Sequence, residues 1–233
     1  DLMRIFGSDS MNNMLEKLGL RDDESIDHPW INKALERAQQ KVEARNFDIR
    51  KTLLKFDNVL NDQRHVIFSQ RNGVIDSKKP FDYSDEFLIE IVNHLLFLKT
   101  QKLSQNKSNE FNNQLKTLLG KSVNDQEFND LMNLKDNELK DNVNLKFIEA
   151  RNERINILGE DKAKEIEKRI LLQSIDLNWK SHIQYLEQLR QVIGLRSYGQ
   201  RDPLVEYKKE AFNLFENLLN KLKIDFITIL INL

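Results

Sequence analysis

The residues with the clearest binding chemistry lie in one short segment, Gly194–Pro203, between two long stretches with helical apolar spacing. A tyrosine ring gives contact area at low entropy cost, and its hydroxyl can donate or accept a hydrogen bond. A guanidinium binds carboxylate or carbonyl oxygens. The residues themselves fit either a contact with another polypeptide or a solvated turn. The predicted binding residues are Arg196, Ser197, Tyr198, Gly199, Gln200 and Arg201.

The sequence has none of the common phosphate-binding or zinc-protease motifs. It contains no G-x-x-x-x-G-K-[ST] phosphate loop, no G-x-G-x-x-G turn and no H-E-x-x-H pair. Its four histidines stand apart, and His182, three residues after Trp179, is interpreted as a core or interface residue. We therefore predict no catalytic residue, no metal ligand and no cofactor for this chain.

Two long helices must position the binding segment. Lys162–Ile193 carries apolar residues at a spacing near 3.5, and a second such stretch follows Pro203. Asp202 is a suitable N-cap and Pro203 suits the first helical turn. Because the connection is short, the two helices are predicted to lie antiparallel, with the segment at the exposed tip of the hairpin.

A still longer helix is predicted over Pro29–Gln70, ended by Asn72-Gly73 as a left-handed stop. Its length would be about 60 Å. Apolar residues occupy different faces along it, which favours a scaffold with several neighbours, and we expect Trp179 to pack against it. Half of a coiled-coil dimer is the alternative, but Arg45 and Thr52 interrupt the heptads.

Composition restricts the class of protein further. Lysine plus arginine (36) nearly equals aspartate plus glutamate (37), which argues against a nucleic-acid binder. The seven glycines and three prolines leave few turns, so the chain should be all-α. The absence of cysteine suits a reducing compartment. No secretion signal is recognised, and the longest apolar run, Phe226–Ile231, is too short to cross a bilayer.

Between the long helices the sequence becomes rich in asparagine. Here we predict a small helical subdomain with four helices, the first beginning at Ser84 as N-cap. The segment before Pro29 is predicted to form short amphipathic helices, and its abrupt start suggests that the chain is cut from a larger protein. The four predicted helices are Ser84–Leu103, Asn109–Leu119, Asp125–Leu131 and Leu145–Ile157.

Several long motifs resemble one known family. Residues 42–64 read VEARNFDIRKTLLKFDNVLNDQR, residues 177–183 read LNWKSHI, and residues 189–203 read LRQVIGLRSYGQRDP. The shorter runs EYKKEAF (206–212), IDHPW (26–30) and Ser8-Asp9 agree as well. Together they resemble SecA, the ATPase that drives preproteins through the bacterial translocon. The likeness is close over 1–72 and 160–233 and weaker between them.

The resemblance implies a division of the chain. Residues 1–26 would end the second nucleotide-binding lobe and enter the scaffold, and 27–72 would be the long scaffold helix. Residues 73–160 would form the helical wing, and 161–233 the two-helix finger with the scaffold continuation. In the family a tyrosine at the finger tip touches the polypeptide at the mouth of the translocon, and this position matches Tyr198.

The resemblance also implies partners and a location. They would be a preprotein, the SecY channel and the motor lobes of the same protein, in the cytoplasm and peripherally on the inner membrane. ATP and Mg would bind the full-length protein, upstream of this chain, and the family's zinc tail is absent here. A free-standing helical adaptor and an enzyme fragment that retains activity are the alternatives.

Overall fold

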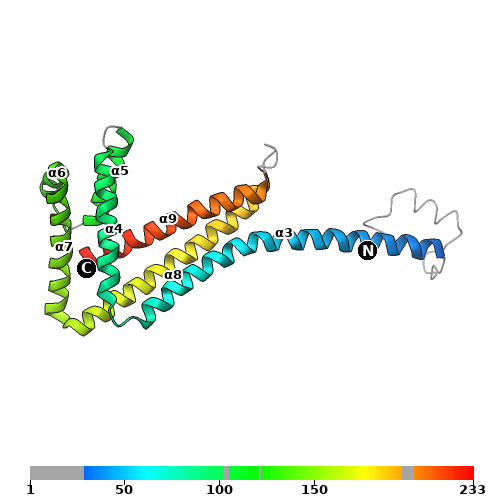
Figure 1. Cartoon of the computed structure of the whole chain (residues 1–233), viewed down its shortest axis with the longest axis horizontal. Coiled ribbons are helices and arrows are strands. Elements are labelled where there is room, and N and C mark those ends of the chain that lie inside the picture. Colours follow the sequence, from blue (N-terminus) through cyan, green and yellow to red (C-terminus); the bar gives the residue numbers. More distant parts are fainter. Residues whose placement is uncertain (1–28, 102–104, 121, 196–201) are drawn as a thin grey trace. The chain divides into compact units, whose positions relative to one another are not determined.

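The computed structural model describes residues 29–101, 105–120, 122–195 and 202–233. In these ranges the chain forms seven helices and no strand, which confirms the all-α prediction (Figure 1). The helices are α3 (Pro29–Asp76), α4 (Pro80–Thr100), α5 (Gln105–Leu119), α6 (Asp125–Asn133), α7 (Asp136–Leu158), α8 (Glu160–Ile193) and α9 (Pro203–Asn232). The predicted helices in residues 1–28 lie outside this part of the chain.

The chain divides into two compact units, Asp1–Asn58 and Val59–Leu233. The described part of the first unit is the N-terminal portion of α3. The second unit holds the rest of α3 and the six other helices. The predicted scaffold, wing and finger boundaries remain predictions.

Helix α3 begins at Pro29 as predicted but does not end before Gly73. It continues to Asp76, and Gly73 keeps a helical backbone instead of the predicted left-handed one. The continuation buries Val74, which is 3% exposed in the apolar core. A Cβ at position 73 would lie 3.3 Å from the hydroxyl of Tyr83, so the glycine permits a close approach of α4 rather than a stop.

The first helix of the predicted wing also starts earlier than expected. Helix α4 begins at Pro80, which fits a first helical position, and Ser84 lies inside the helix rather than capping it. Ser84 is fully buried, and its hydroxyl contacts Glu167 of α8. One stripe of α4 faces the apolar core, since Leu88, Ile91, Leu95 and Leu98 are buried and Phe87 is partly buried.

Helices α6 and α7 of the predicted wing have well-defined starts. At α6 the side chain of Asn124 accepts from the Glu127 N–H at 2.8 Å, and the Glu127 carboxylate accepts from the Asn124 N–H at 3.1 Å. Helix α7 begins at Asp136, nine residues before the predicted Leu145. Its first turns are rich in polar residues, and the prediction therefore missed the apolar stripe there. The stripe consists of Leu139, Val143 and Phe147, which are all buried.

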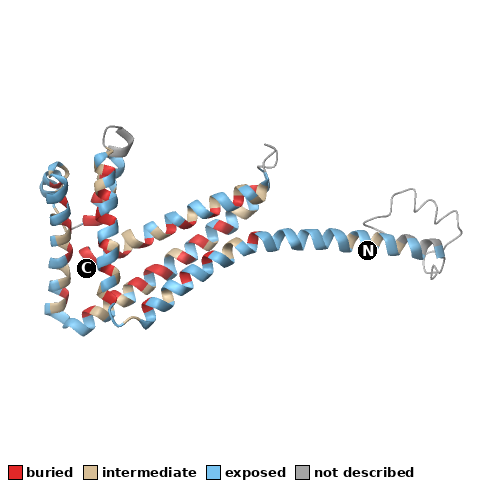
Figure 2. Cartoon of the chain, in the orientation of Figure 1, coloured by how far each residue is buried: buried red, intermediate tan, exposed pale blue. Residues whose placement is uncertain are grey.

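Many residues of the helices in the second unit are buried, as the red segments of Figure 2 show. One continuous apolar core joins α3, α4, α5, α6, α7, α8 and α9. Phe87 of α4 meets Phe226 of α9 edge to face, with ring centroids 6.1 Å apart. Thus helices α4–α7 share their core with α8 and α9 instead of having a separate one.

Candidate functional site

The predicted hairpin is formed by α8 and α9, which lie side by side over most of their length (Figure 1). Helix α9 opens as predicted, since the Asp202 carboxylate accepts from the N–H of Leu204 at 2.8 Å and Pro203 occupies the first turn. The facing stripes are buried at Leu186 and Ile193 of α8 and at Tyr207 of α9. The two helices are therefore buried against their neighbours up to the end of the hairpin where residues 194–202 connect them.

The six predicted binding residues, Arg196, Ser197, Tyr198, Gly199, Gln200 and Arg201, lie outside the described residues. The structure describes the helix ends on either side of them, Ile193 and Pro203. Three apolar side chains beside this segment were not among the predicted site residues. They are Val192, Leu195 and Val205, exposed by 54%, 67% and 59%.

The hairpin is joined to the long helix by a buried polar contact. Gln63 of α3 donates from Nε2 to the carbonyl oxygen of Ala211 in α9 at 3.0 Å. Its Oε1 lies 2.7 Å from Nε2 of His182 in α8. Because a carbonyl oxygen only accepts, His182 donates this bond and carries its proton on Nε2. One glutamine therefore ties both hairpin helices to α3.

Two aromatic rings of the hairpin, Trp179 and Phe215, lie next to the ring of His182. The ring of Trp179 lies 5.6 Å from that of His182, and the ring of Phe215 lies 5.7 Å from it, measured between centroids. Trp179 is 8% exposed, as expected for a core residue, and its neighbour His182 bonds α3 directly. The interpretation of His182 as a core histidine is confirmed, since it is 3% exposed.

Burial lowers the pKa of His182 from 6.5 to about 4. The folded state thus holds the neutral ring, whereas the unfolded chain takes up a proton near pH 6.5. Stability is complete above that pH and falls as the pH drops towards 4, by on the order of 3 kcal/mol in all. His182→Gln removes the titration and retains an amide able to donate to Gln63.

Urea unfolding of both proteins at pH 7.5 and pH 4.5 measures this effect. The stability difference between the original chain and His182→Gln should shift in favour of the variant at the lower pH. Carboxylates that titrate in this range affect both proteins equally. An equal loss in both proteins would mean that His182 accepts its proton in the folded state.

Two further contacts hold α8 along the C-terminal part of α3. Arg71 and Asp176 form a bidentate ion pair, with Nε 2.9 Å and Nη2 3.3 Å from the two carboxylate oxygens. The Lys168 ammonium donates to the backbone oxygen of Ile75 near the end of α3. A cation suits that position because the last carbonyls of a helix carry partial negative charge.

The N-terminal portion of α3 has a second feature of functional interest. Four large apolar side chains are exposed by 44–61% within two turns: Phe47, Ile49, Leu53 and Leu54. They belong to the different stripes that predicted several neighbours for this helix. An apolar surface of this kind on a helix is typical of a contact site.

The described ranges, 29–101, 105–120, 122–195 and 202–233, contain neither a membrane-spanning helix nor a cluster of metal ligands. Within them, no helix has the length and apolar character needed to cross a bilayer. The same ranges hold no group of three or more histidine or acidic side chains placed to bind a metal ion.

Known proteins match this chain over nearly its whole length. Residues 25–233 match the SecA Wing and Scaffold domain family. The chain is 82% identical over all 233 residues to the protein translocase subunit SecA of Pelagibacter ubique (strain HTCC1062), and covers 27% of that protein. It is 45% identical over 229 residues to SecA 1 of Nitrobacter hamburgensis, with 96% of this chain and 24% of the relative covered.

A third relative, SecA of Bradyrhizobium diazoefficiens, is 46% identical over 228 residues, with 94% of this chain and 23% of the relative covered. The chain thus spans about a quarter of the length of these curated relatives. The residues that match the family include all the described helices, α3 to α9. The chain therefore belongs to the SecA Wing and Scaffold domain family.

Proposed function

We propose that this chain supplies the scaffold, wing and two-helix finger of a SecA-like, ATP-driven motor that moves preproteins through the SecY channel. ATP and Mg would bind the motor lobes of the full-length protein, and this chain would transmit the effect of hydrolysis. The protein would act in the cytoplasm, peripherally on the inner membrane. Family membership and the names of the relatives support this proposal.

The observation that carries the coupling role is the contact of Gln63 with both hairpin helices. Its amide bonds His182 of α8 and Ala211 of α9, so a displacement of α3 acts on the two helices together. All three residues are buried, which protects the bonds from competition with water. The N-terminal portion of α3 has exposed apolar residues, including Phe47 and Leu54, and these would contact the motor lobes.

The finger tip would contact the moving polypeptide or the channel. Tyr198 supplies a ring that tolerates many sequences, and Arg196 and Arg201 supply donors for carbonyl or acidic groups. The exposed Leu195 and Val205 beside the segment add apolar area. The combination suits a substrate whose sequence changes as it passes.

Two proteins compared side by side test the proposal. The first is the chain by itself, which should show no binding of ATP with Mg by calorimetry, since its sequence lacks a phosphate loop. The second is a chimera in which these 233 residues replace the matching residues of the Pelagibacter ubique relative. It should hydrolyse ATP and transport a preprotein into inner-membrane vesicles.

Each part of the comparison can contradict the proposal. Micromolar nucleotide affinity of the chain would place an active site within it. A folded chimera that hydrolyses ATP but never transports would favour the free-standing adaptor over the motor part.

A further inference from the structure

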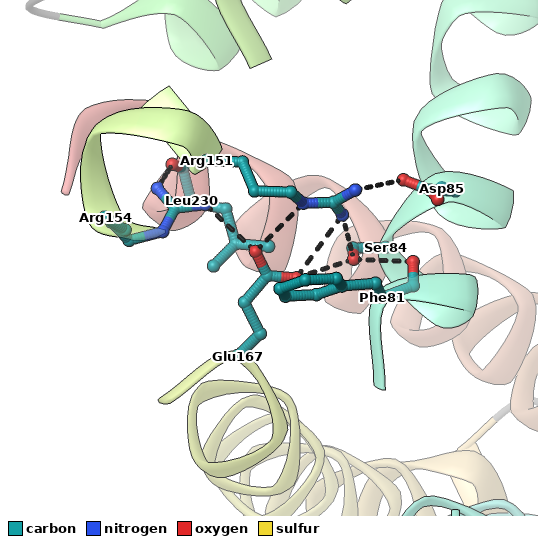
Figure 3. Close-up of polar contacts among 7 residues, drawn as sticks. All are labelled: Phe81, Ser84, Asp85, Arg151, Arg154, Glu167 and Leu230. Carbon is teal, nitrogen blue, oxygen red and sulfur yellow. Dashed lines mark hydrogen bonds and ion pairs between the residues drawn. The ribbon is translucent and has the colours of Figure 1, made fainter. Parts of the chain in front are cut away.

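A cluster of charged side chains lies inside the helical assembly, where α4, α7, α8 and α9 meet (Figure 3). We call it the Glu167 cluster. It consists of Ser84, Asp85, Arg151, Arg154 and Glu167. Glu167 is completely buried and Arg154 is 6% exposed. Charges so far from water need an explanation, because burial of an ion is costly unless it is fully paired.

Both carboxylate oxygens of Glu167 are bonded. Oε1 accepts from Arg154 at 3.0 Å and from Arg151 at 3.3 Å. Oε2 lies 2.7 Å from the Ser84 hydroxyl and 3.4 Å from Arg151. The carboxylate therefore joins α8 to α7 through two arginines and to α4 through a serine.

The two arginines carry the connection further. Arg151 donates to Asp85 and Ser84, each at 2.7 Å, and its guanidinium lies 4.4 Å from the ring centroid of Phe81 and 4.6 Å from that of Phe147. Arg154 donates to the backbone oxygen of Leu230, in the last turn of α9. A positive charge there matches the partial negative charge at a helix C-terminus.

The cluster lies close to the joint between the wing and the hairpin. One residue, Gly159, separates α7 from α8, and it adopts φ +84°, which L side chains rarely adopt. A Cβ built on it would have no neighbour within 4 Å. Gly159 itself has no side chain that could restrain the angle between the helices, whereas Arg154 and Glu167, five residues before it and eight after it, bridge them.

Apolar contacts and buried ion pairs restrain an angle differently. Apolar burial is non-directional, so related packings have similar energies. A buried, hydrogen-bonded ion network adds little net stability over apolar side chains of similar volume, but it requires one geometry. We propose that the Glu167 cluster fixes the angle between α7 and α8, so that helices α4–α7 turn as one body with the hairpin of α8 and α9. This inference does not depend on the proposed function.

Spin labels can measure the angle, because the sequence contains no cysteine. Asp141→Cys in α7 and Lys180→Cys in α8 place labels on exposed residues far from Gly159 along both helices. The apolar triple variant Arg151→Met, Arg154→Met, Glu167→Leu should unfold at a urea concentration equal to or above that of the original chain. Its label-to-label distance distribution should nevertheless widen about twofold.

The control is Asp176→Asn, which removes an exposed ion pair between α8 and α3 and should leave the α7–α8 distribution unchanged. If the triple variant does not fold, Glu167→Gln serves instead, since it keeps the side-chain shape and removes the charge, and it should also widen the distribution. The proposal is overturned if the variant that folds, either the triple variant or Glu167→Gln, has a distance distribution as narrow as that of the original chain. Apolar packing would then set the angle.

Discussion

Trp179→Ala is expected to lower the free energy of unfolding by about 3–5 kcal/mol, the usual cost of removing a large aromatic side chain from a core. The indole is 8% exposed and belongs to the continuous apolar core of the second unit. Its ring lies 5.6 Å from that of His182, so its removal leaves a cavity beside the hydrogen bond to Gln63. Loss of packing there would weaken the junction of the hairpin with α3.

The matched control is Leu177→Ala, two residues away on the same helix. Leu177 is 58% exposed, so its truncation should change stability by less than about 0.5 kcal/mol. Urea unfolding of both variants at neutral pH measures the difference. Equal effects of the two substitutions would show that the indole contributes no more to the core than an exposed leucine.

Much of the fold follows from apolar spacing and helix caps. The predicted start of α8, Lys162, lies two residues from the observed one. Asp202 caps α9 as predicted. Long amphipathic helices carry many repeats of one pattern, so few other structures satisfy it. Helix boundaries in the wing depend on single residues and were predicted less well.

The wrong boundaries share a physical cause. Gly73 has the sequence signature of a helix stop, yet burial of Val74 and the close approach of Tyr83 favour three more helical residues. Ser84 has the signature of a cap, but its hydroxyl is used by Glu167, 83 residues further along the chain. In each case a tertiary contact outweighs a local preference, and no local pattern contains that contact.

The candidate site could be predicted only in part, because a local sequence pattern does not contain tertiary contacts. The chemistry of the connecting segment is visible in the sequence, whereas the contact of Gln63 with His182 joins positions 119 residues apart. One feature of the sequence does indicate the Glu167 cluster. Glu167 and Arg154 occupy positions of otherwise apolar stripes, where a charge implies a buried partner.

Tyr198→Ala in the chimera with the Pelagibacter ubique relative is expected to reduce preprotein transport about tenfold, equivalent to losing about 1.4 kcal/mol of a central aromatic contact. Thermal stability should remain nearly unchanged, because the pairing of α8 and α9 has buried residues of its own, such as Leu186 and Tyr207. Tyr198→Phe keeps the ring and should retain about half of the transport or more.

The control for this substitution is Tyr185→Ala. Tyr185 lies on the same hairpin, in α8, and is 60% exposed, so its removal also deletes a surface aromatic ring. It does not belong to the connecting segment and should leave transport unchanged. A comparison of Tyr198→Ala with Tyr185→Ala therefore shows whether transport needs an aromatic ring at position 198 or only an exposed ring somewhere on the hairpin.

The most direct test is ATP-dependent transport of a preprotein into inner-membrane vesicles, measured per folded chimera molecule for Tyr198→Ala, Tyr198→Phe and Tyr185→Ala. The proposed role of the chain predicts that only Tyr198→Ala loses transport, with its unfolding temperature preserved. If Tyr198→Ala instead lowers the unfolding temperature while transport per folded molecule stays the same, the tyrosine is a packing residue and the finger does not act through it.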